Sequence, residues 1–143
     1  MDIRQITPDF FTAPQIVAED MPQIAAYGIK LVLCNRPDSE IPPDLQAAAL
    51  AQAAAAAGVD YVVQPLTHQN MTPDVIAANF ALIDACDGPV LAYCASGTRS
   101  TIAWALGATK GMSADAIINA ARTGGYDLEH LRPTLLALEA SKD

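Results

Sequence analysis

Cys94 and Arg99 lie in one short polar segment, Cys-Ala-Ser-Gly-Thr-Arg-Ser, and this pairing suits covalent chemistry on an anion. A cysteine thiolate is a strong nucleophile that forms covalent intermediates. The arginine guanidinium presents a rigid fork of donors that matches a tetrahedral oxyanion. The segment therefore predicts a nucleophilic sulfur inside an anion-binding loop.

The residues on either side of this segment predict a strand, a tight loop and a helix. Residues 89–93 (PVLAY) form an apolar run of strand type, and residues 102–106 form the apolar part of the following helix. The N–H groups of such a loop and of a helix start attract anions, so they would bind substrate and stabilise the Cys94 thiolate. The loop residues assigned to this role are Ala95, Ser96, Gly97 and Thr98.

Each candidate side chain also has a purely structural interpretation. A free cysteine is often an inert buried residue, and an arginine can form a surface ion pair. The presence of Cys94 and Arg99 in one loop favours the catalytic interpretation for both. For Ser100 two roles stay open, a hydrogen bond to the thiolate or capping of the helix.

Strands and helices alternate along the chain, which predicts a parallel α/β sheet covered by helices on both faces. The whole of residues 1–143 is expected to form one domain, because no repeat or linker interrupts the pattern. Strands are predicted over 10–12 (as a short edge strand), 30–34, 60–64 and 89–93. Helices are predicted over 19–27, 44–57, 72–86, 100–107, 113–123 and 128–140.

Three loops should meet at the carboxyl edge of this sheet, where open α/β sheets place their sites. They are residues 35–40, 66–71 and 94–99. His68 is therefore a candidate acid or substrate contact, against the alternative of a solvated loop residue. Arg36 is a candidate accessory residue, with a scaffold pairing to Glu40 as the alternative. Cys34 also ends a strand, so a disulfide to Cys94 is a further alternative.

Composition excludes several classes of function. The formal charge of −8 disfavours nucleic-acid binding, which needs a basic surface. No apolar run is long enough for a membrane span, and no signal peptide is visible. Three cysteines do not suit a disulfide framework, so a cytoplasmic protein is expected. No zinc-site spacing and no glycine-rich nucleotide loop is present, so neither a metal nor a cofactor is predicted.

Several motifs resemble known families. Protein-tyrosine and dual-specificity phosphatases carry His-Cys, five residues, Arg and Ser/Thr, whereas rhodanese-type sulfurtransferases carry a loop one residue shorter, as here. Over nearly the whole chain the sequence is similar to the phosphatase-like domain of beta-lactamase-hydrolase-like proteins, a small bacterial family. The matching segments are 28–30, 35–40 and 90–100. The resemblance implies a three-layer protein-tyrosine-phosphatase-like fold and a catalytic Cys94.

The sequence also departs from these families. Members of the small family commonly have Arg where this chain has Ala95, and phosphatases have His where it has Tyr93. The Asp that phosphatases use as a general acid is replaced by His68, with the next aspartate at Asp74. A positioned acid contributes roughly 10²–10⁴-fold to ester hydrolysis, so these departures favour sulfur chemistry over phosphatase turnover.

Sulfur transfer is the leading prediction from the sequence. Cys94 would take sulfur from thiosulfate or a persulfide, with Arg99 binding the anion, and pass it to a thiol acceptor. The first alternative is phosphomonoester hydrolysis through phospho-Cys94. The second is a regulatory module that binds a small sulfur or phosphate anion without turnover.

Overall fold

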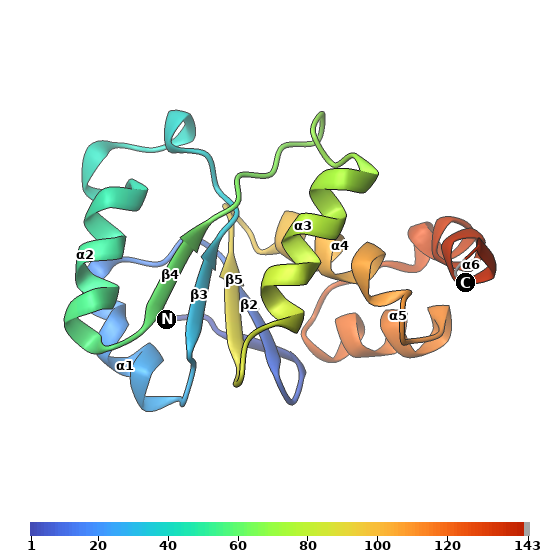
Figure 1. Cartoon of the computed structure of the whole chain (residues 1–143), viewed down its shortest axis with the longest axis horizontal. Helices are drawn as coiled ribbons and strands as arrows, with labels where there is room; N and C mark the ends of the chain where they lie inside the picture. Colours follow the sequence, from blue (N-terminus) through green and yellow to red (C-terminus); the bar gives the residue numbers. More distant parts are fainter. Residues whose placement is uncertain (142–143) are drawn as a thin grey trace.

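Five strands form one sheet in the order β1-β2-β5-β3-β4 in the computed structural model, which describes residues 1–141 (Figure 1). The strands are β1 (Arg4–Thr7), β2 (Phe10–Ala13), β3 (Leu31–Cys34), β4 (Asp60–Val63) and β5 (Val90–Tyr93). All neighbouring pairs are parallel except β1 with β2. Because β2, β5, β3 and β4 are parallel, their carboxyl ends lie along the same edge.

Helices cover both faces of this sheet, which confirms the predicted three-layer α/β architecture (Figure 1). One face packs against α1 (Met21–Ala26) and α2 (Ala47–Ala57); the other packs against α3 (Pro73–Asp84), α4 (Thr98–Ala108) and α5 (Ala114–Thr123). The last helix, α6 (Arg132–Ser141), packs on α4 and α5. No helix within residues 1–141 combines the length and the apolar character needed to cross a bilayer.

The two faces of the sheet bury separate hydrophobic cores, because successive side chains of a strand point in opposite directions. In β5, Val90 and Ala92 join the core under α3, α4 and α5, whereas Leu91 and Tyr93 join the core under α1 and α2. Cys34 at the end of β3 faces the same side as Tyr93. This alternation decides which strand-end side chains can meet.

Some predicted elements differ from the structure for local physical reasons. Residues 10–12 do not form an edge strand, because residues 4–7 form β1 and pair with β2 on its outer side. The helix predicted from residue 44 begins at Ala47: Pro43–Leu45 form a 3₁₀ turn, and Gln46 is extended. The predicted end of this helix at Gly58 and the predicted start of the next helix at Thr72 are confirmed.

Candidate active site

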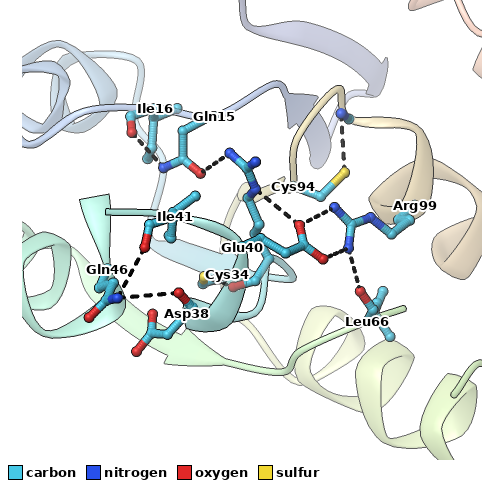
Figure 2. A network of polar contacts seen from close by, with 12 residues as sticks. Gln15, Ile16, Cys34, Asp38, Glu40, Ile41, Gln46, Leu66, Cys94 and Arg99 are labelled. Carbon is cyan, nitrogen blue, oxygen red and sulfur yellow. Dashed lines mark hydrogen bonds and ion pairs between the residues drawn. The ribbon is translucent and has the colours of Figure 1, made fainter. Parts of the chain in front are cut away.

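Three loops meet at the carboxyl edge of the sheet, as the sequence predicts. The link between them is the Arg99 side chain, on the first turn of α4. Its guanidinium donates to both carboxylate oxygens of Glu40, at 2.8 Å each, and to the backbone oxygen of Leu66 at 2.7 Å (Figure 2). One arginine therefore joins the loops that follow β3, β4 and β5.

The Cys94 sulfur lies inside a tight loop at the start of α4. Its side chain is fully buried, and the Gly97 N–H donates to Sγ across 3.1 Å (Figure 2). Gly97 has a φ of +91°, a left-handed conformation that glycine adopts without strain, and α4 begins at the next residue. The predicted helix start at Ser100 is thus two residues late. The turn at Gly97 directs its amide back onto the sulfur.

The other loop amides divide into two groups. Thr98 N–H donates to Ser96 Oγ at 3.3 Å, so this amide shapes the loop instead of remaining free for substrate. Within residues 1–141, the N–H groups of Ala95, Ser96, Arg99 and Ser100 have no acceptor. Unpaired amides at a helix N-terminus form a ready anion site.

Arg99 keeps part of its donor capacity for an anion. A guanidinium has five N–H donors, and three of them bind Glu40 and Leu66, which leaves two. Nη1 makes two of these bonds and Nη2 makes one, so the remaining pair lies on the Nε–Nη2 edge. The Glu40 contact raises the pKa of Arg99, and the nearby Cys94 sulfur adds to this effect. Arg99 therefore forms the ion pair that the sequence offered as one alternative, and two of its donors remain available for an anion.

Glu40 orients Arg99 and is itself held by a second arginine. Arg36 Nε donates to Glu40 Oε1 at 3.1 Å, and Arg36 Nη1 donates to Gln15 Oε1 at 3.2 Å. The hydrogen bonds from Arg99, the strongest influence, and from Arg36 lower the pKa of Glu40. The predicted pairing of Arg36 with Glu40 is confirmed, and it places Arg36 behind the site as a positioning residue.

Ser100 follows neither of the two predictions made for it. Its hydroxyl donates to Asn35 Oδ1 at 2.8 Å inside the core, so it is not directed at the Cys94 sulfur. The N-cap position belongs to Gly97, three residues earlier. Asn35 in turn donates to the Gln64 carbonyl and to Asn79 Oδ1, both at 2.9 Å. Ser100 therefore ties α4 to the ends of β3 and β4.

Cys34 and Tyr93 belong to a separate cluster. Cys34 is a free thiol, as is Cys94, so the disulfide alternative is not formed; its S–H donates to the Arg36 carbonyl at 3.4 Å. Tyr93, which stands at the position of the phosphatase histidine, has its hydroxyl 2.6 Å from that of Tyr61. Burial, and then the neighbouring Cys34, raise the pKa of both tyrosines.

Two residues that support the loop have no signal in the sequence. The Tyr126 hydroxyl donates to the Ser96 carbonyl at 3.2 Å and packs so close that a Cβ on Gly97 would lie 2.1 Å from its oxygen. The Gln15 N–H donates to the Ala95 carbonyl at 3.3 Å. Gly97 is therefore required both by its backbone conformation and by the close approach of Tyr126.

His68 lies at a depression of about 530 Å³ beside the loop, as the sequence suggested it would. Residues of all three loops line this depression: Glu40, Thr67, His68, Gln69, Ala95, Ser96, Thr98 and Arg99. Within the described residues, no three His, Cys, Asp or Glu side chains come together as a set of metal ligands.

The family model for the phosphatase-like domain of beta-lactamase hydrolase-like proteins matches residues 2–111. The chain belongs to this family. The match contains all three loops of the site and ends before α5, so Tyr126 lies outside it. The resemblance found in the sequence is confirmed.

Relatives of known sequence or structure agree with this assignment. The chain is 34% identical over 118 residues to the beta-lactamase hydrolase-like protein of Agrobacterium fabrum; the match covers 81% of this chain but only 27% of that protein. It is 35% identical to a candidate phosphatase from Neisseria meningitidis, with a TM-score of 0.83 over 96% of this chain and 99% of the other. Tk-PTP in its active form shares the fold, with a TM-score of 0.72 at 17% identity over 98% and 97% of the two chains. The fold is that of the protein-tyrosine phosphatases.

Proposed function

We propose that the protein is a phosphomonoester hydrolase that acts through a phosphocysteine on Cys94. The observation that carries the proposal is the Gly97 N–H on the Cys94 sulfur, with the Arg99 fork beside it, in a chain of a phosphatase-like family. This replaces sulfur transfer as the leading hypothesis, because the family and the relatives support phosphatase chemistry.

In the first step, the Cys94 sulfur attacks the phosphorus of a phosphate monoester dianion. An S–P bond forms as the P–O bond to the leaving group breaks. The free N–H groups at the start of α4 and the Nε–Nη2 edge of Arg99 bind the three non-bridging oxygens, whose charge is spread over them in the transition state.

In the second step, water attacks the phosphorus of the phosphocysteine. The S–P bond breaks, inorganic phosphate leaves, and the sulfur returns to the thiolate. The Gly97 amide, 3.1 Å from Sγ, stabilises the thiolate as a leaving group in this step. The loop therefore offers one set of donors to the phosphoryl oxygens and another, the Gly97 amide, to the sulfur.

Release of p-nitrophenol from p-nitrophenyl phosphate, measured with wild type and with Cys94→Ser, tests the proposal. Wild type should turn over, and the variant should lose activity to background because a serine hydroxyl is not ionised at neutral pH. Turnover that survives Cys94→Ser would contradict the proposal. Binding of inorganic phosphate without turnover would instead support the anion-binding module.

Sulfur transfer remains a second candidate because four residues separate Cys94 from Arg99, one fewer than in the phosphatase loops. In that reaction the Cys94 sulfur takes the outer sulfur of thiosulfate, sulfite leaves, and a thiol acceptor removes the bound sulfur. Assay of thiosulfate and p-nitrophenyl phosphate in parallel separates the two. Faster thiocyanate formation from thiosulfate and cyanide than phosphate release would favour this candidate.

A further inference from the structure

The leaving oxygen of a phosphate ester needs a proton as its bond to phosphorus breaks, and the residues around the site offer few donors. Glu40 cannot serve, because both of its oxygens accept from arginines and its pKa is lowered mainly by Arg99. Arg99 does not lose a proton in the ordinary pH range. The acid must come from elsewhere in the depression.

Asp38 and Asp74 are the aspartates in or nearest to the loops that follow β3 and β4. Both have other roles and lie outside the depression. Asp38 Oδ1 accepts the Ala47 N–H at 2.9 Å and so caps the start of α2. Asp74 is in the first turn of α3, where a carboxylate interacts favourably with the helix dipole. Neither residue lines the depression beside the Cys94–Arg99 loop.

His68 is the remaining acid–base side chain of the depression, and its loop is firmly held. The Thr67 N–H donates to Asn70 Oδ1 at 2.8 Å, and Asn70 Nδ2 donates to the Pro65 carbonyl at 3.1 Å. At the start of this loop, the Leu66 carbonyl accepts a hydrogen bond from the Arg99 guanidinium at 2.7 Å. The side chain that binds the anion thus also anchors the loop that carries the imidazole.

We propose that His68 is the general acid of the phosphatase reaction, donating its imidazolium proton to the leaving oxygen; this inference rests on the proposed function. In the second step the neutral imidazole accepts a proton from the attacking water, which restores the imidazolium. The proton given in the first step is therefore recovered in the second, and the two steps sum to ester plus water giving alcohol plus phosphate.

A histidine acid differs from a carboxylic acid in charge. Its active form is a cation, so it attracts the phosphate dianion as well as protonating the leaving group. The charged groups that line the same depression are Glu40 and Arg99, and Arg99 also interacts with the Cys94 sulfur.

Two aryl phosphates that differ in leaving group test the role of His68. Phenyl phosphate needs the acid, whereas p-nitrophenolate is stable enough to leave without it. The measured quantity is kcat/KM, because it reports the phosphorylation of Cys94, in which the leaving group departs, and not the hydrolysis of phosphocysteine that both substrates share. His68→Asn should lower kcat/KM on phenyl phosphate on the order of 10²-fold, and on p-nitrophenyl phosphate less than about 10-fold. The matched control is His130→Asn, since these are the only two histidines of the chain and His130 is exposed on the turn before α6. His130→Asn should leave both rates unchanged.

The two proposals fail in different ways. Equal losses on the two substrates, or a loss no larger than that of His130→Asn, would overturn the role of His68 while Cys94-dependent turnover by wild type upheld the proposed function. No phosphate release by wild type would overturn both. His68→Asp provides a further check, because a carboxylic acid should restore phenyl phosphate turnover with an optimum at lower pH. Thermal unfolding of each variant confirms that it is folded.

Discussion

Two neighbouring parallel strands each end near a buried cysteine and an arginine, yet the two sulfurs make opposite kinds of hydrogen bond. Cys34 ends β3 and is followed by Arg36; Cys94 follows β5 and precedes Arg99. The Cys34 thiol donates to the Arg36 carbonyl, whereas the Cys94 sulfur accepts the Gly97 N–H. One sulfur faces an acceptor and the other faces a donor.

We propose that backbone direction, and not burial, separates the two cysteines, because both are almost fully buried. A donor stabilises a thiolate, whereas a carbonyl acceptor favours a neutral thiol. Burial raises the pKa of Tyr61 and Tyr93, which belong to the same cluster as Cys34. The glycine turn at 97 is the local feature that β3 lacks.

Exchange of each cysteine for alanine gives the largest expected contrast. Cys94→Ala should lower phosphate release by more than ~10³-fold, because the covalent path is lost. Cys34→Ala should leave kcat within about 3-fold of wild type and lower the free energy of unfolding by about 1 kcal/mol, as is typical of a small core truncation. Steady-state kinetics and denaturant unfolding of both variants give the comparison. Similar activity losses in the two would contradict it.

Exchange of each arginine for lysine should have the next largest effect. Arg99→Lys keeps the charge but loses the fork, so kcat/KM should fall roughly 10²–10³-fold. Arg36→Lys, the matched control, changes the contacts to Glu40 and Gln15 and should cost less than about 10-fold. The measurement is kcat/KM with p-nitrophenyl phosphate. An Arg36→Lys loss equal to that of Arg99→Lys would show that both arginines bind substrate.

Glu40→Gln should have a smaller effect, which depends on pH. Loss of the carboxylate frees Arg99 to move, and kcat should fall roughly 10-fold. The pKa of Glu40 is lowered from 4.5 by folding, so its contribution to stability is present above about pH 4.5 and is lost as pH falls through the lowered value. Because the side chain is 32% exposed, the contribution at pH 7 should be only about 1 kcal/mol.

Denaturant unfolding of wild type and Glu40→Gln from pH 7 to pH 3 measures this contribution. The difference between the two proteins should shrink steadily as pH falls. A difference that stayed constant over this range would show that the Glu40 charge does not stabilise the fold.

The sequence predicted the features that depend on local pattern. The apolar strands, the helix starts at Thr72 and Ser113 and the loop from Cys94 to Arg99 follow from residues close together in the chain. The meeting of the three loops followed from the parallel direction of the strands, whose carboxyl ends share one edge. Convergence of His68 and Arg99 on one depression could therefore be predicted.

The remaining contacts depend on residues far apart in the sequence. Ser100 binds Asn35 across 65 positions, and Tyr126 binds the Ser96 carbonyl across 30. The sequence leaves two roles open for Ser100, and only the position of Asn35 in the fold gives its hydroxyl a different partner. The early start of α4 has a local cause instead, the φ of +91° at Gly97.

Mapping of the covalent intermediate tests the central claim most directly. The enzyme is mixed with p-nitrophenyl phosphate, quenched in acid and digested, and the cysteine peptides are weighed by mass spectrometry. One phosphoryl group should appear on the peptide with Cys94, and none on the peptides with Cys34 or Cys86. A phosphoryl group on Cys34, or turnover with no adduct on Cys94, would contradict the assignment of Cys94 as the nucleophile.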